Sequence, residues 1–214
     1  MEFYPNPDLL RTTMRILAAI ASDPKGAARD VVNETLYMHS VTSHGKLEGL
    51  RFVASDGHRA CAITLGPVSE SRPIAPATFR VPADPQHALL RDRFIGVTPN
   101  AFTAIDHASD PLTKVVKLLV HQPVPFPIDV VQEHFDSLND ASKPSIRRAT
   151  LNAEYVSDGL SIVRALWKST QLAPQFEFIW PINVERAFGI TSRCTNETGL
   201  LFAVEYVVMP YKPL

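Results

Sequence analysis

The 214-residue chain is poor in cysteine, with only Cys61 and Cys194. The two are not in a CxxC spacing, which favours small buried thiols over a disulfide or a zinc site. The sequence also contains no HExxH, G-x-S-x-G or Walker-loop motif, the common signatures of metal, acyl-transfer and phosphate chemistry. We therefore expect a protein that binds rather than catalyses, with no metal and no cofactor.

Long apolar runs and strong net charge are missing too. No run approaches the roughly 18 residues of a membrane span, and the opening MEFYPNPDLL lacks the basic and apolar regions of a signal peptide. We expect a cytoplasmic protein without membrane contact. The formal net charge of −1 excludes a generally basic nucleic-acid binder, so any contact with DNA must come from charge gathered on one face.

The most informative stretch is 50–65, LRFVASDGHRACAITL. An Asp-Gly pair between two apolar runs predicts a β-hairpin whose two turn residues both have positive φ. Ser55, Asp56, His58 and Arg59 crowd polar groups at its tip. A plain hairpin with a polar end is the alternative to a functional site.

The chain divides into three stretches, about 1–74, 75–146 and 147–214, each predicted as a helix followed by strands. Asn6 and Asn152 are expected to cap helices over 7–21 and from 153 onward. A short helix is predicted over 82–93. The proline-rich 124–129 is predicted as a connector, and the polar 132–145 as a linker. Strands are predicted at 31–41, 50–54, 60–65, 78–81, 94–97, 101–105, 115–120, 148–151, 176–180, 184–190 and 200–208.

Three segments together resemble one family. VASDGHRA at 53–60 is similar to the ATDGHRLA signature of the bacterial DNA polymerase III beta subunit, the sliding clamp. YVVMPYKPL at 206–214 resembles the YVVMPMRL end of those clamps, and LNAEYVSDGL at 151–160 resembles the F-N-x-x-Y-L-x-D-x-L that opens their last helix. The three matches occur in the family's order, which makes the combined signal specific.

The resemblance implies an α+β protein with the DNA clamp fold, built of about three repeated helix-plus-antiparallel-sheet units. Residues 1–131 would form a domain of two units similar to the family's middle domain. Residues 132–146 would be a linker, and 147–214 a single unit similar to the C-terminal half of the last domain. A family subunit has six units and two subunits make a ring, so four copies of this chain would supply the same number of units as a family ring. A monomer or a ring of another size stays open.

The implied function is that of a replication processivity factor: an oligomeric ring that encircles duplex DNA without reading its sequence and tethers a DNA polymerase. The DNA-facing candidates are the cations beside the apolar faces of the predicted helices: Arg11, Arg15, Lys25, Arg91, Arg93, Arg164 and Lys168. Ordinary solvated surface residues are the alternative for each of them.

A second implied site is a pocket for short peptides of DNA polymerases and the clamp loader. Its residues would be Ser55, Gly57, His58, Arg59, Ala60, Pro127, Val131, Val208, Met209, Pro210 and Tyr211. Ala60 stands where the family has leucine and Tyr211 where it has methionine, so a reshaped pocket is expected. The alternatives are a stand-alone clamp-like module that binds such peptides without encircling DNA, or a metal-dependent hydrolase. The hydrolase would draw its ligands or general base from Asp56, His58, Asp106, His107 and the other histidines, His39, His44, His87, His121 and His134.

Overall fold

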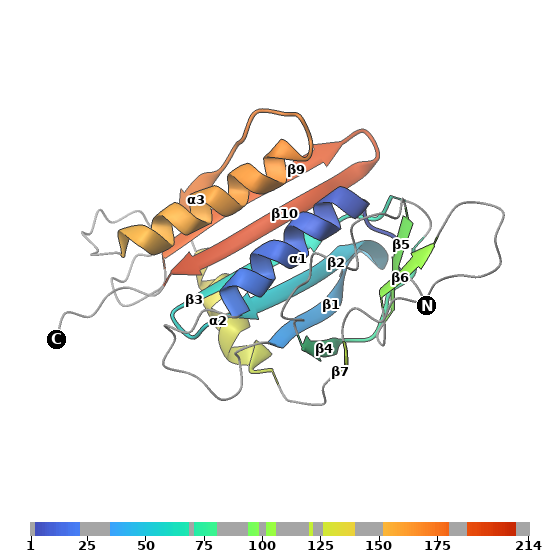
Figure 1. The fold of residues 1–214 in the computed structure, drawn as a ribbon, viewed down its shortest axis with the longest axis horizontal. Coiled ribbons are helices and arrows are strands. Elements are labelled where there is room, and N and C mark those ends of the chain that lie inside the picture. The colour runs from blue at the N-terminus through green and yellow to red at the C-terminus, as the bar shows by residue number, and fades with distance from the viewer. Residues whose placement is uncertain are drawn as a thin grey trace.

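The computed structural model describes residues 3–21, 35–68, 71–80, 94–98, 102–105, 120–121, 126–139, 152–179 and 188–208. Figure 1 shows their arrangement. The helices are α1 (Pro7–Ala21), α2 (Ile128–Asn139) and α3 (Ala153–Lys168). The strands are β1 (Thr35–Ser43), β2 (Lys46–Ser55), β3 (Arg59–Leu65), β4 (Ala77–Arg80), β5 (Phe94–Val97), β6 (Phe102–Ile105), β7 (Val120–His121), β8 (Glu177–Ile179), β9 (Phe188–Asn196) and β10 (Gly199–Val208).

Eight of these strands form one sheet in the order β7-β4-β1-β2-β3-β10-β9-β8, with antiparallel pairing throughout. Within it β3 pairs with β10, in register from Leu65 opposite Phe202 to Arg59 opposite Val208. Strands β5 and β6 form a separate hairpin. One continuous sheet therefore contains strands from both the predicted first domain and the predicted C-terminal unit, while the division into domains stays a prediction.

Helices α1 and α3 lie side by side on one face of the sheet (Figure 1). Both present an apolar stripe inward, and residues such as Leu17 and Leu166 join Phe52, Ile63 and Phe202 of the strands in the main core. The helices run antiparallel, since Thr12 near the start of α1 lies 3.5 Å, Oγ1 to Oγ, from Ser169 after the end of α3. Asn152 caps α3 as predicted, its side chain accepting a hydrogen bond from the amide of Glu154.

Helix α2 covers the opposite face of the sheet, behind β3 in Figure 1. Phe126, Val131 and Phe135 are buried there against strand residues that alternate with those of the main core: Val53, Ala60, Ala62 and Val207. The Arg51 guanidinium carbon lies 5.0 Å from the centre of the Phe135 ring, and Arg51 also pairs with Glu205 at 2.7 Å. The sheet is therefore the middle layer of three.

Several elements differ from the sequence predictions. Residues 128–129, predicted as connector, and 132–139, predicted as linker, are helical and belong to α2. Strand β9 covers Phe188–Asn196 rather than 184–190. The predicted helix over 82–93 and the strand at 148–151 lie outside the described residues. No described helix is long and apolar enough to cross a membrane.

Candidate partner-binding and DNA-facing surfaces

The Asp-Gly hairpin exists, but its turn is not the predicted two-residue type. Strand β2 ends at Ser55 and β3 begins at Arg59, so the loop comprises residues 56–58. Within it only Gly57 has positive φ, at 86°. A two-residue turn with positive φ at both positions occurs instead at His44 (50°) and Gly45 (74°), between β1 and β2.

Side chains at the end of β2 and in the loop determine its shape. One carboxylate oxygen of Asp56, Oδ1, accepts hydrogen bonds from the amides of His58 and Arg59, both at 2.9 Å. The hydroxyl of Ser55 donates to the carbonyl of Arg59 at 2.9 Å and accepts from the amide of Gly57 at 3.1 Å. Ser55 and Asp56 thus hydrogen-bond the backbone of the turn, including the Arg59 carbonyl that also accepts from the Asp56 amide at 3.2 Å, a role suited to these short polar side chains.

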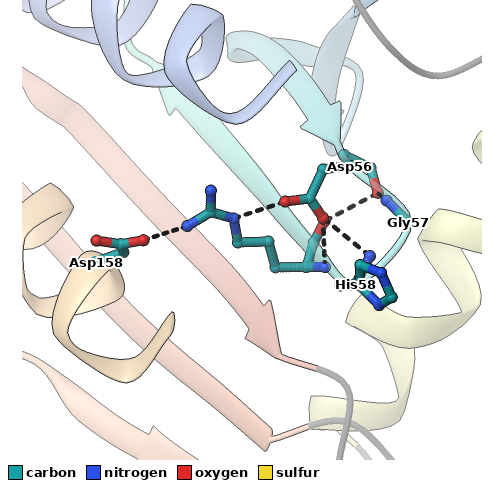
Figure 2. A network of polar contacts seen from close by, with 6 residues as sticks. Asp56, Gly57, His58 and Asp158 are labelled. Atoms are coloured by element: carbon teal, nitrogen blue, oxygen red, sulfur yellow. Dashed lines mark hydrogen bonds and ion pairs between the residues drawn. The ribbon is translucent and has the colours of Figure 1, made fainter. Parts of the chain in front are cut away.

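Arg59 is only 7% exposed and is held from two directions. Its Nε donates to Asp56 Oδ2 at 2.8 Å, and its Nη1 pairs with Asp158 of α3, as Figure 2 shows. Its guanidinium carbon also lies 4.9 Å from the centre of the Tyr155 ring, close enough for a cation–π contact. A buried cation is compensated here by two carboxylates and an aromatic face.

Tyr206 of β10 completes this arrangement. Burial alone lowers the pKa of the Arg59 guanidinium, but Tyr206 and Asp56 raise it above its ordinary value, so Arg59 stays charged. For Tyr206 burial acts in the other direction and raises the pKa. The charge of Arg59 offsets part of that rise, and the phenol stays neutral. The three segments that carry the sequence resemblance therefore meet in space around one arginine.

The predicted pocket residues lie on two faces of the sheet. Ala60 and Val131 belong to the cluster under α2, whereas the Arg59 side chain contacts α3 and Val208 belongs to the core under α1 and α3. Gly57 is exposed, His58 and Pro127 are half-buried, and Ser55 is buried. Met209, Pro210 and Tyr211 lie outside the described residues.

The structure adds apolar residues that sequence reasoning did not assign to the α2 face. Val207, paired with Ala60 across β3 and β10, is buried there together with Phe126 and Phe135. The sequence could have identified Val207, because neighbouring residues of a strand point to opposite faces and Tyr206 belongs to the main core. These side chains are buried under α2. The end of this face at the 56–58 loop is open to solvent, since Gly57 is exposed and His58 and Pro127 are half-buried, and this loop end is the candidate partner surface.

The other candidate surface is the outer side of α1 and α3. Arg15, Arg164 and Lys168 are exposed there, whereas Arg11 is half-buried and paired with Asp8. Because the helices are antiparallel, the start of α1 lies toward the end of α3 that carries Arg164 and Lys168, whereas Arg15, in the second half of α1, lies beside Asp158 and Ser161 near the middle of α3. A cavity of about 270 Å³ between the helices is lined by Arg15, Ile16, Ala19, Ile20, Arg59, Asp158, Ser161 and Ile162. Lys25, Arg91 and Arg93 lie outside the described residues.

Within the part of the chain that the structure describes, no group of three or more His, Cys, Asp or Glu side chains is placed to hold a metal ion. Cys61 and Cys194 are buried free thiols, as predicted. Burial raises the pKa of the Cys61 thiol far above its ordinary range, which makes it unreactive as a nucleophile. The polar contacts described above, those of Ser55, Asp56 and Asp158, hold the 56–58 loop and the buried Arg59 in place.

No family model and no curated protein matches the sequence, but solved structures do. A Caulobacter crescentus pol III beta is 15% identical with a TM-score of 0.59, over 100% of this chain and 66% of that one. A putative DNA polymerase III beta subunit from Eubacterium rectale is 13% identical, with a TM-score of 0.58 and the same coverages. The DNA polymerase III subunit beta from Pseudomonas aeruginosa is 15% identical, with a TM-score of 0.54, over 100% of this chain and 67% of that one.

At such identities the likeness shows the fold: the chain is an α+β protein with the clamp fold. Within that class it spans about two-thirds of the length of the bacterial DNA polymerase III beta subunits that it matches. The resemblance predicted from three short motifs is confirmed at the level of fold.

Proposed function

We propose that this protein is a DNA sliding clamp, a non-catalytic cytoplasmic processivity factor that encircles duplex DNA as an oligomeric ring and tethers a DNA polymerase through a short peptide. One observation carries the proposal: in a clamp fold, a single sheet has a helix pair with exposed cations on one face, and on the other face α2 packs on an apolar cluster beside the partly exposed 56–58 loop. We further propose a two-unit domain and a single unit, residues 1–131 and 147–214, with the first extended to the end of α2 at Asn139 because the helix continues past residue 131.

The helix pair supports a weak, sequence-independent attraction to DNA. Arg15, Arg164 and Lys168 extend from rigid helices rather than loops, which suits contacts with phosphates. The acidic residues Asp8, Glu154 and Asp158 on the same helices limit the total positive charge. A ring that is retained by its topology requires no stronger grip.

The edge of the sheet supports self-association. Among the described strands β8 is the last of the sheet on this side, and an unpaired edge is a ready template for another chain. Phe176 (43%) and Phe178 (44%) are exposed at or beside this edge. We infer that β8 supplies one of the contacts between copies in the ring.

The register of the central strands supports the peptide site. Val208, the last residue of β10, pairs with Arg59, the first residue of β3. Strand β10 therefore ends directly beside the 56–58 loop, which supports a site shared by this loop and the residues that follow Val208. Peptides of DNA polymerases and the clamp loader are the proposed ligands.

The decisive test combines solution mass with DNA topology. Light scattering should give a closed oligomer, a tetramer if twelve units complete the ring. This species should remain on nicked circular DNA and be lost when the circle is cut. A monomer that binds polymerase peptides but not circular DNA would contradict the ring and favour the stand-alone peptide-binding module, an alternative consistent with the chain's reduced length.

The tail variant Met209→Ala/Pro210→Ala tests the peptide site separately. It should lose binding to peptides taken from the polymerase and clamp-loader subunits of the source organism while its solution mass stays unchanged. Normal peptide binding by this variant would show that the tail is not part of the site.

A further inference from the structure

Asp158 is the exposed end of a chain of contacts that runs from α3, through Arg59 at the start of β3, to Asp56 in the loop. The Asp158 side chain is 51% exposed on α3. The side chain of its partner Arg59 is 6% exposed, and that of the next carboxylate, Asp56, is 1% exposed. Figure 2 shows the three side chains in line, from the helix to the loop. The contact therefore joins the helix face to the loop that borders the candidate partner surface.

We propose that Asp158 is a positioning residue for the partner-binding loop: from the helix face it holds Arg59, and through Arg59 the carboxylate of Asp56 that shapes residues 56–58. The proposal about peptide binding rests on the function proposed above, whereas the effect on the loop itself does not.

The mechanism follows from the shared carboxylate of Asp56. Its Oδ2 accepts from Arg59 Nε, while its Oδ1 accepts from the amides of His58 and Arg59. Any rotation of the Arg59 side chain therefore pulls on the group that fixes both amides. With Asp158 removed, the buried guanidinium keeps only one of its two carboxylates and gains by turning toward solvent, because an incompletely compensated buried charge is costly.

The exposed position of Asp158 links the same contact to DNA. Asp158 and Arg15 line the cavity between α1 and α3, on the side where phosphates are proposed to approach. A carboxylate there repels phosphate, and its removal leaves less negative charge beside Arg59 on this face. Loss of Asp158 is therefore expected to affect the two surfaces in opposite directions.

Hydrogen exchange of the oligomer as purified tests the positioning role directly. In Asp158→Asn the amides of His58 and Arg59 should exchange about tenfold faster, while amides in β9 and β10 keep their protection. Glu154→Gln, which removes the same charge from the same helix, should leave both amides unchanged, and Asp158→Glu should restore most of the protection. Unchanged exchange in Asp158→Asn would overturn the proposal, and so would an equal loss of protection across the sheet.

Binding measurements then test the coupling. Asp158→Asn should bind the polymerase-derived peptide several-fold more weakly and duplex DNA several-fold more tightly at low salt. Weaker binding of both would indicate a general folding defect and overturn the coupling, as would unchanged peptide binding by a folded variant. If the wild-type protein binds no such peptide, the proposed function fails, yet the exchange experiment still decides the role of Asp158.

Discussion

Gly159 of helix α3 lies directly against Tyr206 of strand β10. A Cβ built at position 159 would be 2.6 Å from Tyr206 Cδ1 and 2.7 Å from Ile190 Cδ1, closer than real Cβ contacts. Only glycine lets the helix approach the sheet this closely, and the same approach brings the neighbouring Asp158 within reach of Arg59. Backbone proximity at one residue therefore determines the electrostatic contact at the next.

Gly159→Ala should destabilise the protein by about 1–2 kcal/mol. Overpacking of a well-filled core typically costs about 1–3 kcal/mol, which outweighs the gain of up to about 1 kcal/mol in helix propensity. Denaturant unfolding measures the change. The control Ser161→Ala, at an exposed position of the same helix, should stay within about 0.5 kcal/mol of wild type. A Gly159→Ala variant as stable as the control would contradict the close packing of α3.

Phe135→Ala should lower the free energy of unfolding by about 3–5 kcal/mol, the usual cost of truncating a buried phenylalanine. Phe135 is fully buried between α2 and the sheet and lies beside Arg51. Val130 lies on the same helix but is 59% exposed, so Val130→Ala should change stability by less than about 0.5 kcal/mol. Similar effects of the two substitutions would mean that α2 does not dock through its apolar side.

Arg15→Glu combined with Arg164→Glu should weaken binding to duplex DNA at low salt. Each lost phosphate contact is also expected to reduce the slope of log affinity against log salt by about 0.9. Fluorescence anisotropy at several salt concentrations gives both quantities. Lys46→Glu makes the same kind of charge reversal at the exposed first residue of β2 and should leave the slope unchanged. A slope equally altered by Lys46→Glu would indicate a general charge effect.

The free energy of unfolding should decrease as the pH falls below about 6.5, the ordinary pKa of histidine, because of His39. Burial, together with the charge of Arg51, lowers the pKa of His39 in the folded state. The unfolded chain therefore binds a proton first, and stability falls with falling pH until the folded pKa is passed. Denaturant unfolding between pH 7.5 and 5.0 should show a shallower decline for His39→Gln. His44→Asn, in the exposed turn between β1 and β2, serves as the control.

The helices on the main core were predictable because their signals are local. An asparagine cap and an apolar stripe define α3, and a similar start defines α1. Helix α2 was missed because prolines precede it and its apolar anchors are few among polar residues. Its stability comes from packing on the sheet, which no local pattern reveals.

Strand β9 was misplaced because its second half alternates polar residues with small buried ones. Ser192 points inward, where its hydroxyl accepts a hydrogen bond from Trp167 Nε1 at 2.7 Å. A search for apolar runs does not register such a position as core. The loop shape was missed for a related reason, since the hydrogen bonds of Asp56 replace the turn geometry that an Asp-Gly pair usually favours.

The candidate site was predictable only in part. The sequence identified the residues of the 56–58 loop and its flanks, but their partners come from distant segments: Arg59 and Asp158 are 99 positions apart. Nothing in the spacing of the residues indicates that the Arg59 side chain lies on the helix face rather than in the partner surface. That assignment depends on which face of β3 meets α3, a property of the assembled sheet.

The pairing of β3 with β10 also limits how early the sheet can form while the polypeptide is being synthesised on the ribosome. Strand β3 is made early, whereas its neighbour in the middle of the sheet emerges only after most of the chain has been synthesised. Until then β3 is an apolar strand with an open hydrogen-bonding edge, the kind of surface that recruits chaperones or seeds aggregation. Production of this protein should therefore be most vulnerable at the stage when translation has passed β3 but has not yet reached β10.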